Sequence, residues 1–405
     1  MTHSAKTTGP GQPNPTPWSR ALGVAVALSV VAGLILLLFA WPAVTAVPQN
    51  LPVGVVGDDA QVTQVEATVA EKADGAIALT RYDSRDDAVA AIERRESYGA
   101  IVLGASPTDA PEILTASAAS PTVAQMLDEL AHSMQAAIDE QIRSAVETQI
   151  TAAQQDAAAR VQSILEAVRS GQTPQIPESA PSASVQIPVV TVTVTDIVPF
   201  AASDPRGVGL GVALFPLVLG GLAVGIVSTL VVRGSAVRRV TTVVVAAVGA
   251  GLVLAGILQG LFGALQGSFW LNAAACAATI AAIAATVTGF AGLLGPAGVG
   301  VGAVFTMLLA NPLSAAAIPV EFLVRPWGAI GQWLPPGAGA TLLRSLSYFP
   351  DAATAQQWIV LLVWAAGGLA LTLVDLPARR LRAGQTAAEH PLTVTYRRRL
   401  FAMLY

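Results

Sequence analysis

The sequence predicts a multi-pass α-helical membrane protein with six transmembrane helices and an extracytoplasmic domain, an α/β module plus a long helix, inserted between helices 1 and 2. Three observations lead to this prediction. Hydrophobic residues make up 53% of the 405 residues and charged residues only 12%, against about 25% charged in a typical soluble chain. The apolar residues are gathered in long runs. The segment 48–206, which follows the first run, is polar instead.

Six apolar runs are long enough to cross a bilayer, which requires roughly 20 apolar residues in a helix. The first exceeds the roughly 7 to 15 apolar residues of a signal peptide. We therefore expect an uncleaved anchor, with a signal peptide cleaved after "VTA" as the alternative. The expected spans are residues 21–44, 207–232, 240–262, 272–294, 298–322 and 358–374.

The positive charges of the short loops predict the orientation. The turn "RGSAVRR" carries Arg233, Arg238 and Arg239, whereas the next loop, "GALQGSFWLN", carries no charge. We therefore expect the first turn in the cytoplasm. Residues 1–20 are expected to form a disordered cytoplasmic tail and residues 375–405 a basic one, so both termini of this cell (plasma) membrane protein are predicted to be cytoplasmic.

The expected outer domain, residues 48–206, is acidic, with 22 acidic and 9 basic side chains. "LPVGVVG" is typical of a short buried strand, and a helix is expected at 58–72. "AIALTRY", "DSRDDAVAAIERRE" and "YGAIVLG" then predict strand, helix and strand, and "PEILTAS" one more strand. Asp83 or Ser84 is placed to cap the middle helix.

A long helix is predicted after Pro121, because apolar residues recur every three or four positions from Val123 to Val168. Unbroken, it would be on the order of 70 Å long. Its repeat is longer than that of a straight helix, so a partner helix, a right-handed wrap or a break near Thr151 is expected. Packing on its own domain and packing against a second subunit are both open. A Pro/Ser-rich linker, 174–188, and a strand in "VVTVTVTDIVPF" follow.

The motifs of common enzymes are missing from the sequence. A phosphate-binding P-loop requires G-x-x-x-x-G-K-[ST], and neither of the two lysines, Lys6 and Lys72, follows a glycine. The three histidines have no ligand spacing for zinc. We therefore expect no enzyme activity, no cofactor, no metal and no nucleic-acid partner.

The segment before the last expected span is too rich in proline and glycine to cross the membrane. "RPWGAIGQW" and "GATLLRSLSYF" are each long enough only to dip into the outer face, and Pro335 and Pro336 break the chain between them. A re-entrant hairpin is therefore predicted at 325–349. Glu321 and Arg325 are four residues apart, which predicts either a local ion pair or a gate.

These features together resemble a known family. The anchor, the outer domain with "LPVGVVGDD" and "YGAIVLGASPTDAPEILTASAASPTVAQMLDEL", and the five further spans with "IGQWLPPGAGATLLRSLSYF" look like the type-2 ABC exporter permease superfamily. Within it, the chain is most similar to the actinobacterial YhgE and phage-infection-protein (Pip) outer-domain group.

The resemblance implies a membrane-spanning permease subunit, homodimeric or heterodimeric, that moves lipid-like or amphipathic substrates outward with a separate ATP-binding subunit. It implies a cytoplasmic coupling loop at Arg233, Arg238 and Arg239. It also implies an outward exit path or gate, formed by Glu321, Arg325, Pro335, Pro336 and Arg344. The alternative is a non-transporting envelope receptor, scaffold or secretion accessory protein that acts through its outer domain.

Overall fold

A computed structural model describes residues 17–73, 75–104, 109–171 and 190–389. Five of its helices are long and apolar enough to cross a membrane, which confirms a multi-pass helical membrane protein. They are α1 (Trp18–Val44), α5 (Val208–Leu230), α6 (Ala236–Ala255) with its π-helical extension η1 (Gly256–Leu261), α7 (Phe269–Leu294) and the first part of α11 (Ala355–Glu389).

The expected span at 298–322 is wrong as a single helix. The chain forms α8 (Pro296–Val304) and the π-helix η2 (Phe305–Ala310), and the continuous helix then ends. Fifteen residues reach only about 22 Å, short of the roughly 30 Å hydrocarbon core. The break falls at "NPLS", because Pro312 has no N–H to donate to the preceding turn, and Ala315 then leaves the helical region with φ 51°. Two 3-10 turns follow, η3 (Pro312–Ser314) and η4 (Val320–Phe322).

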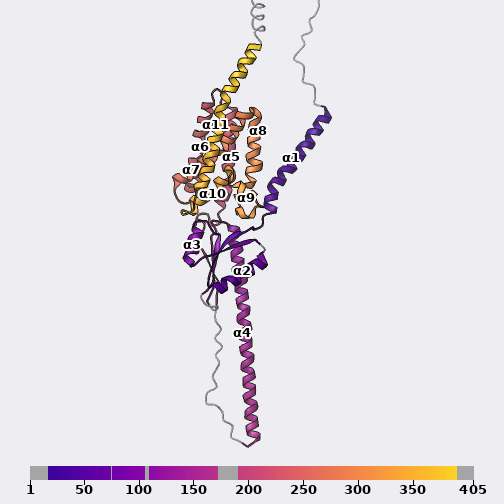
Figure 1. Ribbon diagram of the computed structural model, residues 1–405, viewed down its shortest axis with the longest axis vertical. Coiled ribbons are helices and arrows are strands. Elements are labelled where there is room, and N and C mark those ends of the chain that lie inside the picture. Colours follow the sequence, from indigo (N-terminus) through magenta and orange to yellow (C-terminus); the bar gives the residue numbers. More distant parts are fainter. Residues whose placement is uncertain (1–16, 74, 105–108, 172–189, 390–405) are drawn as a thin grey trace, which may run out of the picture.

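The helix α7 packs against five other helices of the bundle, α5, α6, α8, α10 and α11. Small residues permit this arrangement, since they let helix backbones approach closely. A Cβ at Gly221 of α5 would lie 2.7 Å from the Cβ of Ile283 on α7, and one at Gly289 of α7 would lie 3.0 Å from the Cα of Gly368 on α11. By contrast, α1 diverges from the bundle over most of its length and approaches it only near η2 and η3 (Figure 1).

The outer domain contains a five-stranded sheet of order β2-β1-β3-β4-β5. Strand β1 pairs in parallel with β2 and β3, β3 pairs antiparallel with β4, and β4 pairs in parallel with β5. The predicted strands and helices near these positions are confirmed. Their bounds are β1 (Leu51–Val56), α2 (Asp59–Ala73), β2 (Ile77–Arg81), α3 (Arg85–Glu93), β3 (Gly99–Val102), β4 (Glu112–Thr115) and β5 (Thr193–Asp196). Ser84, one of the two expected caps, accepts a hydrogen bond from the Asp87 amide.

The long helix α4 (Pro121–Arg169) is unbroken, so the break expected as one alternative near Thr151 does not occur. Its first turns pack on the sheet, where Val123, Leu127 and Ala131 are buried. The rest projects away from both the sheet and the bundle (Figure 1). The expected linker at 174–188 lies outside the described residues. Residues 390–405 of the basic tail and most of the N-terminal tail also lie outside them.

The outer domain and the bundle share one apolar core. Buried residues of the sheet and of α3, such as Ile92 and Leu114, belong to the same cluster as Tyr348 and Phe349 beside the bundle. Phe200, after the last strand, packs edge-to-face on Tyr348 with ring centroids 5.7 Å apart. The outer domain is therefore seated on the bundle by apolar contacts, and not only tethered to it by the chain.

Candidate functional site

The predicted hairpin consists of two helices, α9 (Trp327–Gly331) and α10 (Pro335–Tyr348), between the bundle and the outer domain (Figure 1). Pro335 and Pro336 are buried in the first turn of α10, where the missing N–H groups leave no intrahelical hydrogen bond unmade. A Cβ at Gly331 or Gly337 would meet neighbouring backbone oxygens. These contacts fix the sharp break between the two helices.

The expected ion pair between Glu321 and Arg325 is absent from the described residues. Helical spacing would have been needed to bring the two together, but η4 ends at Phe322 and Leu323 is extended, with φ −80° and ψ 137°. Arg325 is exposed. Glu321 faces the outer domain instead, and its Oε2 accepts a hydrogen bond of 2.8 Å from the Tyr98 hydroxyl.

The chain between α1 and the sheet is bonded to the same segment. The Gln49 amide donates to the Glu321 carbonyl at 3.0 Å, and the Val47 amide donates to the Phe322 carbonyl at 3.3 Å. Buried backbone groups require such partners. As a result, the residues before α9 are bonded both to the chain leaving α1 and, through Tyr98, to the outer domain.

Arg95 makes the second polar link between the outer domain and the hairpin. It follows α3 in a left-handed conformation with φ 60°, which turns its side chain away from that helix. One nitrogen, Nη1, donates to the Ser345 hydroxyl at 2.7 Å and to the Thr341 carbonyl at 3.3 Å. The guanidinium lies 5.3 Å from the centre of the Phe349 ring, a cation–π distance.

Burial at this interface acts on two titratable groups of the outer domain. It lowers the pKa of Arg95, although the guanidinium stays charged, and the nearby Tyr98 and Glu321 oppose the shift. Burial, followed by the negative charge of Glu321, raises the pKa of Tyr98. The phenol therefore remains protonated at neutral pH and stays a hydrogen-bond donor to Glu321.

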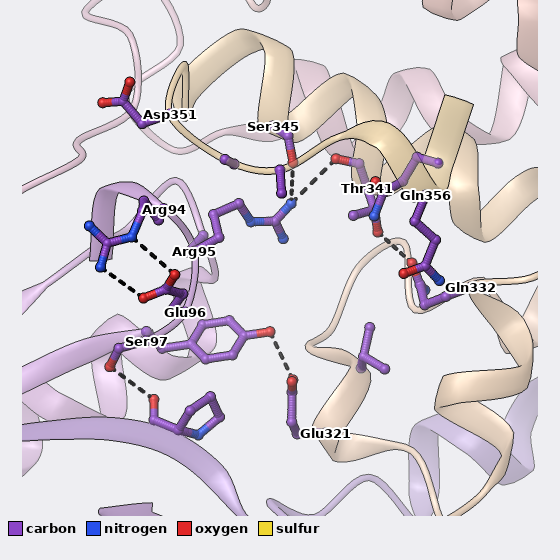
Figure 2. A pocket seen from close by; sticks show the side chains of 17 residues that line it. Arg94, Arg95, Glu96, Ser97, Glu321, Gln332, Thr341, Ser345, Asp351 and Gln356 are labelled. Carbon is purple, nitrogen blue, oxygen red and sulfur yellow. Dashed lines mark hydrogen bonds and ion pairs between the residues drawn. The ribbon is translucent and has the colours of Figure 1, made fainter. Parts of the chain in front are cut away.

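A cavity of about 380 Å³ lies between the outer domain, the hairpin and the start of α11. Figure 2 shows Arg95 and Glu321 entering it from different elements, with Gln332 and Gln356 on a further side. Arg94 also lines it, but Glu96 holds this guanidinium through two hydrogen bonds of 3.0 and 2.9 Å. The volume falls within the range of small-molecule sites, and the lining combines polar and apolar surface.

Arg344, the remaining hairpin residue expected on an exit path, is half-buried on α10 and donates to the Ala316 carbonyl at 3.0 Å. It lies close enough to interact electrostatically with Arg95 and Tyr98. The structure thus brings Glu321 and the hairpin prolines to one region with Arg344 nearby, and leaves Arg325 outside.

The three arginines of the expected coupling loop lie at the opposite end of the bundle from the hairpin. Ser235 caps α6 by accepting from the Arg238 amide at 3.3 Å, so Arg238 and Arg239 belong to the first helical turn and only Arg233 remains in the connecting turn. Cations at a helix N-terminus oppose the helix dipole. An anionic partner outside the chain would offset that cost.

Sequence reasoning missed Arg95 and Tyr98 as partners of the hairpin. Arg95 lies beyond the end of α3, and its local sequence gives no sign of a distant partner. Tyr98 is 223 residues from Glu321 in sequence, and no local spacing connects them. The chain matches no protein-family model, no curated protein and no solved structure.

Proposed function

We propose that the chain is the membrane-spanning permease subunit of an ABC-type exporter, moving lipid-like or amphipathic molecules outward with a separate ATPase subunit. The interrupted helix carries this proposal. α8 and η2 stop at Ala310, a single 3-10 turn with the buried residues Leu313 and Ser314 follows, the backbone of residues 315–319 is then irregular, and the hairpin fills the outer end of the bundle. Irregular backbone within a membrane requires shelter by protein or a cavity, and broken helices are a feature of transporters.

Together with the five long helices, the interrupted segment makes six crossings; it is the fifth in chain order. It begins beside the end of α7, and it ends at Glu321, which contacts the outer domain. The start of α1 and the end of α11 lie on the side opposite the outer domain (Figure 1). This supports six crossings, with both termini cytoplasmic and the outer domain outside the plasma membrane.

An apolar groove between α1 and the interrupted helix supports a lipid-like substrate. It has a volume of about 600 Å³ and is lined by Leu38 of α1 together with residues of α8 and η2, such as Val301 and Phe305. Such a surface selects by size and apolarity because it offers few polar groups. The groove begins next to the segment that leads into the hairpin, which gives an amphipathic molecule a route along the interrupted helix.

The proposed working unit is a homodimer or heterodimer with an ATPase on its cytoplasmic face. The most apolar stretch of α1 has no buried residues within one chain, so lipid or a second subunit must cover it. The arginines of α6, Arg238 and Arg239, form a basic surface that would bind an acidic face of the ATPase.

The ATPase partner can be tested directly. The tagged full-length protein, expressed in its native cells and isolated in lipid nanodiscs, should carry vanadate-sensitive ATPase activity. The double variant Arg238→Glu, Arg239→Glu should lose at least tenfold of this activity. The matched control Arg160→Glu, Arg169→Glu on the distant helix α4 should retain it. Absence of ATPase activity from every preparation would contradict the proposal.

A second candidate is an envelope scaffold or receptor, favoured by the free part of α4. Ile150, Val161, Leu165 and Val168 are exposed there, although long isolated helices are marginal in water without packing. Deleting the distal part of α4 together with residues 172–189 distinguishes the two candidates. An exporter would keep its ATPase activity, whereas a scaffold would lose its protein partner.

A further inference from the structure

The cavity between the outer domain and the hairpin is lined by opposite charges, and some of their hydrogen-bonding atoms have no partner. Both hydrogen bonds of Arg95 leave from Nη1, so Nε and Nη2 have no hydrogen-bond partner among the described residues. Of the Glu321 carboxylate, Oε2 is bonded to Tyr98, and Oε1 has no partner in the same part of the chain. Three N–H groups of Arg95 and one carboxylate oxygen of Glu321 are therefore left for a ligand.

The charges on the two sides are not paired with each other by a salt bridge. The ion pairs among the described residues do not include Arg95, Arg344 or Glu321. A half-buried guanidinium without a carboxylate within 4 Å is costly unless an anion reaches it. Arg344 adds a second positive charge near Arg95.

The other side of the cavity disfavours a purely anionic ligand. Glu321 lies there, so a ligand with negative charge alone would meet a like charge. Asp351 lines the cavity on the side of Arg94 and acts on that guanidinium. A ligand with an anion at one end and a cation at the other would match both sides. Gln332, Gln356 and Thr341 add uncharged polar groups on a third side of the cavity.

The location of the cavity favours a ligand found at a membrane surface. Trp327 and Trp333 of the hairpin are exposed, and tryptophan is enriched where the headgroups of a bilayer meet water. The volume of about 380 Å³ suits a headgroup and excludes the acyl chains.

We propose that this cavity binds a phosphoethanolamine-type zwitterion, with the phosphate at Arg95 and the primary ammonium at Glu321. A guanidinium donates two parallel N–H groups to phosphate oxygens, and Nε and Nη2 of Arg95 form such a pair. The ammonium donates to the free oxygen of Glu321. The binding does not require an ATPase partner, so it is separable from the proposed transport function.

The first test compares three soluble headgroups on the full-length protein in detergent by isothermal titration calorimetry. Glycerophosphoethanolamine should bind at least tenfold more tightly than glycerophosphocholine, which has no ammonium N–H, and than glycerophosphoglycerol, which has no cation. A second arm uses nanodiscs made with phosphatidylethanolamine or with phosphatidylcholine, followed by mass analysis of retained lipid. Binding in either arm supports the proposal, and the arm that responds identifies a free or a membrane source.

Variants then assign the two ends of the ligand. Arg95→Gln should weaken glycerophosphoethanolamine at least tenfold. Glu321→Gln, which still accepts from Tyr98, should remove the preference for ethanolamine over choline. Arg85→Gln is the control, because Arg85 is bonded to Glu112 away from the cavity. If Arg95→Gln folds poorly, Arg95→Lys keeps the charge without the two parallel donors and should still lose several-fold.

Two results would overturn the proposal. One is the absence of binding, or the absence of ethanolamine preference, in both the soluble and the nanodisc arms. The other is binding that neither Arg95 nor Glu321 variants change while their unfolding temperatures match that of the wild type.

Discussion

The helices α1 and α7 have similar lengths and are both strongly apolar, yet their surroundings are opposite. In α1 none of the most apolar stretch is buried within the chain, against 67% in α7, although α1 has the higher mean hydropathy, 2.8 against 1.8. Alanine, glycine and threonine dominate α7, whereas valine and leucine dominate α1. In lipid, apolarity alone does not drive helices together, and small residues permit close contact. Apolarity thus places both helices in the membrane, whereas side-chain size determines how closely each helix can pack against other helices.

The largest expected effect comes from filling a close backbone contact between α7 and α11. A Cβ at Gly368 of α11 would meet the backbone oxygen of Ala285, whereas the adjacent Gly367 has nothing within 4 Å. Gly368→Leu should lower stability by about 3 kcal/mol or more, or prevent folding, because backbone on the facing helix cannot yield to a side chain. The midpoint of thermal unfolding, followed by size-exclusion fluorescence, measures it.

Gly367→Leu is the matched control and should stay close to the wild type. Equal losses in both variants would show that helix propensity or membrane insertion, and not the contact with α7, sets the effect.

A smaller effect is expected at the link between the outer domain and the hairpin. Tyr98→Phe removes the donor to Glu321 and leaves a partly buried carboxylate short of one hydrogen bond, which costs about 1–3 kcal/mol. Amide hydrogen exchange at Val47 and Gln49 should accelerate, because both amides are bonded to the Glu321 segment. Tyr82→Phe serves as the control, since the structure gives the Tyr82 hydroxyl no hydrogen bond within the described residues. Unchanged exchange in Tyr98→Phe would refute the link.

A weaker, pH-dependent contact lies on the outer domain. Arg85 donates two hydrogen bonds to Glu112, and these, followed by one from Thr195, lower the pKa of Glu112. The group therefore contributes stability above its ordinary pKa near 4.5, and this stability is lost as the pH falls through the lowered value. The Arg85 side chain is 41% exposed, so solvent screening limits the effect to under about 1 kcal/mol.

Chemical unfolding of the wild type and of Glu112→Gln between pH 6 and pH 3 measures this contribution. The difference in unfolding free energy between the two proteins should shrink in acid. A constant difference would mean that the carboxylate charge is not involved.

The smallest effect is expected in α1 itself. Leu36 is 69% exposed, so Leu36→Ala should change the stability of the isolated chain by less than about 0.5 kcal/mol. Ile283→Ala, at a fully buried site on α7, should cost about 2–5 kcal/mol. A large loss in Leu36→Ala would show that a second subunit covers α1 in the purified protein.

The sequence predicted local features better than the contacts between them. Alternating apolar residues and the cap at Ser84 placed the strands and helices of the outer domain, because neighbouring residues determine these patterns. The span at 298–322 failed because hydropathy counts apolar residues and gives no weight to one proline at position 312. Arg95 and Tyr98 could not be assigned to the hairpin, since the contacts join residues more than 200 positions apart.

The short connection after α1 has a mechanical consequence. Between the end of α1 and the start of β1, the amides of Val47 and Gln49 are bonded to Phe322 and Glu321, which lie a few residues before the hairpin. These two backbone hydrogen bonds, together with the short chain between α1 and Gln49, connect α1 firmly to the residues before the hairpin. A tilt of α1 in the bilayer would therefore displace the residues before the hairpin, because they are bonded directly to the chain that leaves α1. The sheet lies further along the chain and would be displaced less.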